Sequence, residues 1–133
     1  MNILITGGAG FIGVNAANRF KKHDVVVFDN LSKPGSVNNL KNLPKEVEFV
    51  AGDLRSAEDV ENVFLEHKPF DVILHLGAQT AVTTSFLCPM TDFKTNSLGT
   101  LNILSAALKW APGAHIIYSS TNKVYGKAQL ACP

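Results

Sequence analysis

The sequence has few of the residues that support several common classes of protein. Only two cysteines occur in 133 residues, Cys88 and Cys132, too few for a disulfide framework and without metal-ligand spacing to any histidine. Twelve basic and eleven acidic residues leave a net charge of +1, with no basic run interleaved with aromatics, which excludes nucleic acid as a main partner. No run approaches the roughly 20 apolar residues that span a membrane. We therefore expect a reduced, cytoplasmic protein with no membrane segment and no metal site.

The chain does contain enough apolar residues, 46%, for one globular core spanning residues 1–133. Short β-rich runs predict strands at Ile3 to Thr6, Asp24 to Phe28, Val47 to Ala51, Asp71 to Leu76 and His115 to Ser119. Helical patterns occupy Gly10 to Lys22, short stretches capped by Ser36 and Ser56, and part of Phe86 to Trp110, the longest element. This alternation predicts an α/β fold, a doubly wound parallel sheet ordered 3-2-1-4-5 with its ligand at the carboxyl ends of the strands.

Three glycines follow the first predicted strand at a spacing of three residues. Gly7 suits a tight turn, Gly10 lets the backbone approach a pyrophosphate, and Gly13 lets the next helix lie against the strand. The amides that open this helix, with the helix dipole, would then face the phosphates. The glycines alone are equally compatible with a plain strand-to-helix turn.

Asp29 decides between these interpretations, since it ends the second strand near the spacing at which a carboxylate meets the adenosine ribose hydroxyls. The combination predicts a dinucleotide site. A carboxylate in this place repels the additional phosphate of NADP, so the predicted cofactor is NAD. Lys33 nearby either softens that preference or is a solvated loop residue.

Several ordered motifs together resemble the extended short-chain dehydrogenase/reductase family, in the nucleotide-sugar branch of epimerases, dehydratases and decarboxylases. The resemblance covers essentially the whole chain. It rests on Thr6 to Gly13, Asp29 to Ser32, Gly52 to Arg55, His75 to Gln79, Asn96 to Thr100 and Tyr118 to Gly126.

The resemblance implies that NAD contacts residues from every one of these segments. They are Gly7, Gly10, Phe11, Ile12, Gly13, Asp29, Asn30, Ser32, Asp53, Leu54, Leu76, Gly77, Ala78, Gln79, Asn96 and Ser119. In this family Asp53 accepts from the adenine amino group, although a surface turn is the alternative. Asn96 braces the active-site strand, unless it faces solvent.

The resemblance also implies roles at the reaction centre. Thr121 is the catalytic threonine, whose hydroxyl bonds the oxygen that is oxidised or reduced, and it also contacts substrate. Ser85 faces the substrate, a role compatible with capping the long helix. His75, at the end of a buried strand, is expected to be a hydrogen-bonded core residue without chemistry.

The segment after Thr121 narrows the branch. Nucleotide-sugar 4,6-dehydratases carry an Asp-Glu pair there, whereas this chain has Asn122 and Lys123, neither of which is a carboxylic acid. With Val82 to Ser85, this run resembles most the CDP-hexose 2-epimerases of the branch. The implied substrate is a CDP-hexose-like nucleotide sugar, oxidised transiently and re-reduced by tightly held NAD.

The family's catalytic Tyr-x-x-x-Lys pair is absent from this sequence, because Asn122 lies four residues after Tyr118 and Gln129 four after Tyr125. We expect the chain to be the first part of a longer epimerase, inactive alone. An uncovered apolar surface on the long helix and fifth strand would then favour self-association, which leaves a homo-oligomer open. The alternatives are a standalone dinucleotide-binding module, a dehydratase fragment, and an interaction protein on a vestigial fold.

Overall fold

The protein forms a parallel sheet of five strands in the order β3-β2-β1-β4-β5. The computed structural model describes residues 1–67 and 69–121. The strands are β1 (Asn2–Thr6), β2 (Asp24–Asp29), β3 (Glu48–Ala51), β4 (Val72–His75) and β5 (His115–Tyr118). The doubly wound α/β fold of Rossmann type and its strand order, both predicted from the sequence, are confirmed, with strand ends shifted by at most one residue.

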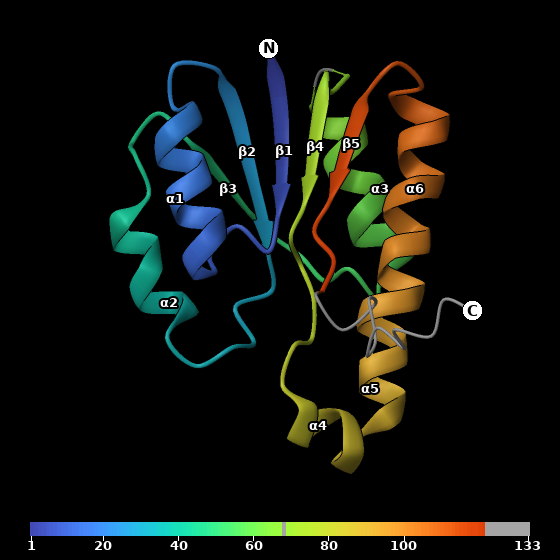
Figure 1. Cartoon of the computed structure of the whole chain (residues 1–133). Helices are drawn as coiled ribbons and strands as arrows, with labels where there is room; N and C mark the ends of the chain where they lie inside the picture. Colours follow the sequence, from blue (N-terminus) through green and yellow to red (C-terminus); the bar gives the residue numbers. More distant parts are fainter. Residues whose placement is uncertain (68, 122–133) are drawn as a thin grey trace, which may run out of the picture.

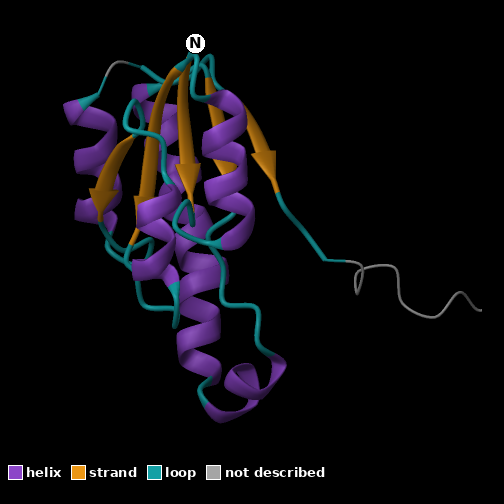
Figure 2. Cartoon of the chain, turned by 90° about the vertical axis from the view of Figure 1, so that its left-hand side faces the viewer, coloured by secondary structure: helices purple, strands orange, loops and turns teal. Residues whose placement is uncertain are grey.

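Helices lie on both faces of this sheet (Figure 1). They are α1 (Phe11–Phe20), α2 (Ser36–Asn39), α3 (Ala57–Glu66), α4 (Val82–Leu87), α5 (Pro89–Phe93) and α6 (Gly99–Trp110), with a 3₁₀ turn η1 (Leu40–Asn42) and a π-helical turn η2 (Lys94–Leu98). All strand arrows point toward the end of the molecule where α4 and α5 project, which Figure 2 shows from the side. Every loop that leaves a strand therefore opens at this one edge.

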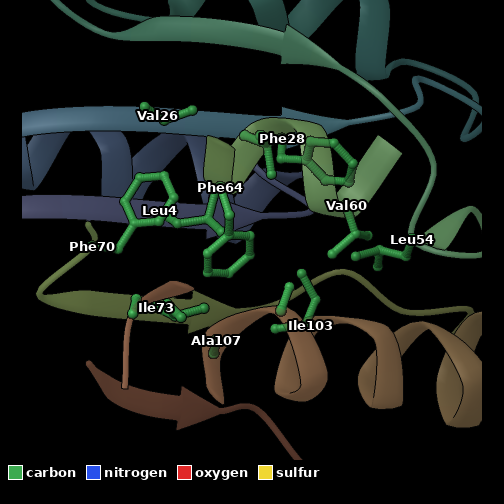
Figure 3. Close-up of a cluster of buried hydrophobic side chains, with 13 residues drawn as sticks. Leu4, Val26, Phe28, Leu54, Val60, Phe64, Phe70, Ile73, Ile103 and Ala107 are labelled. Carbon is green, nitrogen blue, oxygen red and sulfur yellow. The ribbon is translucent and has the colours of Figure 1, made fainter. Parts of the chain in front are cut away.

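One face of the sheet packs against α3 and α6. Their apolar side chains meet those of β1, β2 and β4 in a single cluster (Figure 3), which includes Leu4, Val26, Phe28, Val60, Val63, Phe64, Phe70, Ile73, Ile103 and Ala107. The rings of Phe64 and Phe70 meet edge to face, with centroids 5.3 Å apart. Burial of each large side chain contributes about 1.5–3 kcal/mol, so this cluster fixes the carboxyl ends of the central strands.

The other face packs against α1. Ile3, Ile5, Val25 and Val27 form its apolar layer with the fully buried Ala17 of the helix. Phe11 and Ile12 of α1 do not belong to this layer, because they are 82% and 64% exposed. Both lie in the first turn of α1, next to the carboxyl edge of the sheet, where no strand remains to cover them.

The two predicted serine caps have different outcomes. Ser56 caps α3 as expected, because its Oγ accepts from the backbone N–H of Asp59 at 3.1 Å. Ser36 does not cap α2: the N-cap is Gly35, at φ 90°, and Ser36 is the first helical residue. Glycine adopts this left-handed conformation without a Cβ penalty, and the helix therefore starts one residue earlier than predicted.

The long helix expected within Phe86 to Trp110 is divided. Phe86 belongs to the separate helix α4, and the chain then turns at Cys88 into α5, η2 and α6. Pro89, whose missing N–H is tolerated in a first turn, starts this second run. The break matters because it folds α4 back beside the start of α5.

The predicted uncovered apolar surface is present on α6 and β5. Ile103 and Ala107 of α6 are buried, whereas Leu101, Leu104 and Leu108 on its other side are 58%, 45% and 77% exposed. All four residues of β5 are exposed, among them Ile116, Ile117 and Tyr118. Self-association through this surface remains a prediction.

Candidate functional site

A cleft of about 900 Å³ runs along the carboxyl edge of the sheet. Its volume is within the range of cofactor-binding pockets. Every site residue predicted from the sequence lines it: Gly7, Gly10, Phe11, Ile12, Gly13, Asp29, Asn30, Ser32, Asp53, Leu54, Leu76, Gly77, Ala78, Gln79, Ser85, Asn96, Ser119 and Thr121. The structure thus brings together residues from loops after all five strands.

The glycine loop has the backbone geometry that the sequence predicts. Gly7 adopts φ +65°, and a Cβ there would lie 2.6 Å from Cα of Gly77. A Cβ on Gly13 would collide with the backbone of Gly8 and lie 2.5 Å from the carbonyl oxygen of Gly7. The tight turn and the close helix-strand packing are therefore confirmed, and Gly77 adds a close approach between the loops after β1 and β4.

The N-terminus of α1 opens into this cleft. Its N-cap is Gly10, no side chain caps it, and its first turn contains no acidic residue. The first amides of a helix lack intrahelical acceptors, and the dipole adds partial positive charge. Phe11, Ile12 and Gly13 therefore present their N–H groups where an anionic group of a ligand would be stabilised.

Asp29 is held in a fixed orientation by backbone donors. Its Oδ2 accepts from the N–H of Ala9 at 3.1 Å and its Oδ1 from the N–H of Leu31 at 2.7 Å. Leu31 has φ 56°, a left-handed conformation that costs a non-glycine residue about 1–3 kcal/mol. Each oxygen keeps a further lone pair, so the carboxylate remains able to accept from ligand hydroxyls.

Asp53 lies in the next loop, where Arg55 occupies its carboxylate. The guanidinium Nε lies 2.9 and 3.0 Å from the two carboxylate oxygens, and Asn30 donates to Oδ2 at 3.1 Å. Hydrogen bonding from Arg55 is the main reason why the pKa of Asp53 falls to about 2. The adenine contact predicted for Asp53 thus has a competitor that the motif did not indicate.

The loop after β4 is braced by Asn96. The Asn96 Oδ1 accepts from the N–H of Gln79 at 2.8 Å, and its Nδ2 donates to the Gln79 carbonyl at 2.9 Å. The expectation that Asn96 braces the active-site strand is wrong in its target, since both bonds reach this loop rather than β5. They hold Gln79 by the two polar groups of its backbone, which fixes the wall of the cleft.

His75 is a buried, hydrogen-bonded residue, as predicted, with 2% exposure. The Thr100 hydroxyl donates its one proton to the Asn96 carbonyl at 2.6 Å, so His75 Nε2 must donate to Thr100 Oγ1 at 3.0 Å. His75 Nδ1 is then the acceptor for the Thr6 hydroxyl at 2.7 Å. Burial lowers the pKa of His75 to about 4, which keeps this neutral tautomer.

Ser85 lines the cleft, but it does not cap the long helix. It lies within α4, and its Oγ lies 2.8 Å from Oδ1 of Asp92 in α5. Asp92 also lines the cleft and was missed from the sequence. Its position four residues before Asn96, one helical turn away, was an available signal.

The far end of the cleft follows β5. Ser119 hydrogen-bonds the His75 carbonyl through its N–H at 3.2 Å, and Thr121 lines the cleft two residues later. The predictions about Asn122, Lys123, Tyr125 and Cys132 lie outside the described residues.

A side-chain contact also joins two of the loops that line the cleft. Lys33 Nζ lies 3.1 Å from Thr80 Oγ1, which joins the loop after β2 to the loop after β4. The sequence predicts that Lys33 either softens the preference for NAD or is a solvated loop residue, and neither alternative includes this contact between the loops.

In the two ranges that the structure describes, no group of three His, Cys, Asp or Glu side chains could hold a metal ion. Nor does a helix there have the length and apolarity to cross a membrane.

The fold and the glycine loop define the chain as a Rossmann-type α/β domain with a cleft at the carboxyl edge of its sheet. A family model described as GDP-mannose 4,6 dehydratase matches residues 4–132, and the chain belongs to this family. The resemblance to the nucleotide-sugar epimerase and dehydratase branch of the extended short-chain dehydrogenase/reductases is thereby confirmed.

Similar proteins are epimerases and dehydratases of nucleotide sugars. The chain is 46% identical over 130 residues to CDP-paratose 2-epimerase of Salmonella typhi, an alignment that covers 95% of this chain and 38% of the relative. It is 38% identical over 134 residues to dTDP-D-glucose 4,6-dehydratase of Dictyostelium discoideum, covering 96% and 30%. The chain thus spans about a third of the length of these relatives.

A solved structure agrees with the fold. The UDP-glucose 4-epimerase of Thermus thermophilus, in complex with NAD, superposes with a TM-score of 0.81 at 37% sequence identity. The match covers 91% of this chain and 38% of that one.

Proposed function

We propose that this chain forms the NAD-binding part of a nucleotide-sugar epimerase of the CDP-paratose 2-epimerase type. The observation that carries the proposal is one cleft lined by every residue that the sequence predicts to contact cofactor or substrate. The relative at 46% identity supports the epimerase, as does Asn122-Lys123 in place of the dehydratase acid pair. The dehydratase fragment is the weaker candidate for that reason.

The residues of the cleft fit a dinucleotide. Gly7 and Gly77 carry no side chain where the loops after β1 and β4 meet, and the amides that open α1 face the cleft, where a pyrophosphate would lie close to the backbone. Asn30, Ser32 and Leu54 flank the adenosine end with Asp29 and Asp53. In this proposal the adenine displaces part of the Arg55 contact with Asp53, or reads the loop through the backbone of Leu54.

Asp29 supports NAD over NADP. Backbone donors fix both of its oxygens, so the carboxylate keeps its place whether or not a ligand is bound. It would accept from the two ribose hydroxyls of NAD, whereas the additional phosphate of NADP would lie against a fixed negative charge.

Bound NAD would take a hydride from a sugar carbon and return it to the opposite face. In this proposal the Thr121 hydroxyl bonds the oxygen on that carbon, and Asn96 and Gln79 hold the wall beside it. No tyrosine in the 133 residues is followed four positions later by lysine, so these residues supply no proton-exchanging pair. We therefore propose binding without turnover by these residues alone.

Titration calorimetry with NAD and NADP tests the proposal. Wild-type protein should bind NAD more tightly than NADP. Asp29→Asn, which keeps an acceptor oxygen for the Ala9 or Leu31 amide, should weaken NAD binding about tenfold and narrow the difference. Asp24→Asn, at the exposed opposite end of β2, is the matched control and should change neither affinity.

Two outcomes would contradict the proposal. Saturable binding of neither dinucleotide would refute a dinucleotide site, and tighter NADP than NAD binding would refute the cofactor assignment.

The second candidate function, a non-catalytic dinucleotide-binding module, is favoured by the absent Tyr-x-x-x-Lys pair. Conversion of a CDP-hexose by this chain with NAD would contradict the module and the binding-only proposal alike.

A further inference from the structure

In the helices α4 and α5 the apolar side chains face solvent and the polar side chains face inward, the reverse of the usual arrangement. Their apolar side chains face solvent: Phe86, Leu87, Met90 and Phe93 are 84%, 82%, 62% and 59% exposed. Their half-buried positions are polar, and Ser85, Thr91 and Asp92 line the cleft. A surface helix normally turns its apolar stripe inward. Burial of apolar surface therefore does not explain why the inner side of α4 and α5 is polar. Contact with a polar ligand in the cleft does explain it.

Asp92 is the centre of the hydrogen bonds on this inner side. Its Oδ1 accepts from Ser85 Oγ at 2.8 Å and from Asn96 Nδ2 at 3.2 Å, with Gln79 Nε2 at 3.4 Å. The two amide groups have further acceptors of their own, at 2.9 Å on the Gln79 carbonyl and 2.8 Å on the Ala81 carbonyl. Ser85 has one proton and its shortest acceptor is Asp92, since the Ala81 carbonyl lies at 3.2 Å.

The number of available protons determines which hydrogen-bonding groups Asp92 and Ser85 present to a ligand. The proton of Ser85 points to Asp92, and one lone pair of Ser85 Oγ accepts from Gln79 Nε2 at 3.3 Å, so Ser85 has one further lone pair for a ligand. Within residues 1–67 and 69–121, Oδ2 of Asp92 accepts no hydrogen bond. The pair therefore offers two acceptors and a negative charge, which suits neutral O–H donors and disfavours phosphate.

We propose that Asp92 and Ser85 together form an acceptor site for two neighbouring hydroxyls of a sugar ring, with Asp92 also positioning Ser85. The inference rests on the proposed function and deepens it. Two sources supply this chemistry, the ribose next to the nicotinamide and the hexose of the nucleotide sugar. The site lies beside the loops after β4 and β5, across the sheet from Asp29 and Asp53.

The test is calorimetric titration of the whole chain with AMP, NAD and, in the presence of saturating NAD, CDP-glucose. AMP reaches only the adenosine end and serves as the internal reference. If the ribose occupies the site, Asp92→Asn should weaken the binding of NAD about tenfold. If the hexose occupies it, the same substitution should weaken the binding of CDP-glucose about tenfold. The affinity for AMP should be unchanged in both cases. The ratio of affinities is the readout, because a merely structural defect would move all the ligands together. Asp24→Asn is the charge-matched control.

Ser85→Ala tests whether Asp92 acts partly through the serine. The double variant Ser85→Ala/Asp92→Asn should bind the affected ligand better than the product of the two single fold-reductions in affinity predicts, since the two substitutions remove parts of one site. Equal affinities of wild type and Asp92→Asn for all three ligands would overturn the inference alone. Failure of wild-type protein to bind both AMP and NAD would overturn the proposed function and this inference with it.

Discussion

The two ends of the cleft are built by different means. At the adenosine end, backbone groups and apolar packing set the geometry: Gly7 and Gly13 leave no room for a side chain, and backbone amides orient Asp29. At the β4–β5 end, side-chain hydrogen bonds set it, through Asn96 and Asp92. No residue of α4, α5 or η2 is buried.

This difference predicts how each end responds to change. Backbone collisions cannot be relieved by rotamer changes, so the adenosine end should tolerate no added volume. The β4–β5 end should instead depend on protonation and on the identity of single polar atoms, because its hydrogen bonds have no apolar core beneath them. Two measurements test the contrast, and a third tests the uncovered side of α6.

The largest effect is expected for Gly13→Ala. Alanine normally stabilises a helix by about 1 kcal/mol relative to glycine, but here its Cβ would collide with the backbone of Gly8. We expect a loss of about 3 kcal/mol of unfolding free energy, measured by urea denaturation. Gly113→Ala, with open space around its Cβ position, is the control and should stay within about 0.5 kcal/mol. A stabilised Gly13→Ala would contradict the backbone account of the adenosine end.

The second prediction concerns His75 and pH. Its pKa is lowered from 6.5 to about 4 in the folded protein, so the unfolded chain binds the proton more readily. The stability that neutral His75 contributes is therefore complete above pH 6.5 and decreases as the pH falls from 6.5 to about 4. The total loss over this window is about 3 kcal/mol.

His75→Phe isolates this effect, because other carboxylates titrate equally in both proteins. Phenylalanine keeps a ring next to Tyr118, whose centroid lies 5.6 Å from that of His75. Both proteins are unfolded with urea at a series of pH values. As the pH falls through the window, the unfolding free energy of wild type should decrease relative to that of the variant. A difference that stays constant from about pH 7 to about pH 4 would show that His75 has the same pKa in the folded and unfolded states, and would contradict the prediction.

The same contrast explains how far the sequence could predict the site. The glycine loop, Asp29 and the strand order depend on local patterns and on parallel-sheet topology, and the structure has them as predicted. The sequence did not predict the contact of Arg55 with Asp53 or the position of Asp92 beside Ser85. These depend on side-chain conformations and on the break at Cys88 that folds α4 back, which periodicity does not encode.

The smallest effect on stability is expected for Leu108→Lys on the uncovered side of α6. Leu108 is 77% exposed, so its replacement should change the unfolding free energy by less than about 0.5 kcal/mol. It should nevertheless weaken self-association in sedimentation velocity, because a charge on an exposed apolar patch opposes its burial against a second copy. Ile103→Ala on the buried side of the same helix is the opposite case, with a loss of about 3 kcal/mol and unchanged association. Wild-type protein that stays monomeric at all concentrations would refute self-association, and a large loss of stability in Leu108→Lys would show that this side of α6 is covered within the chain.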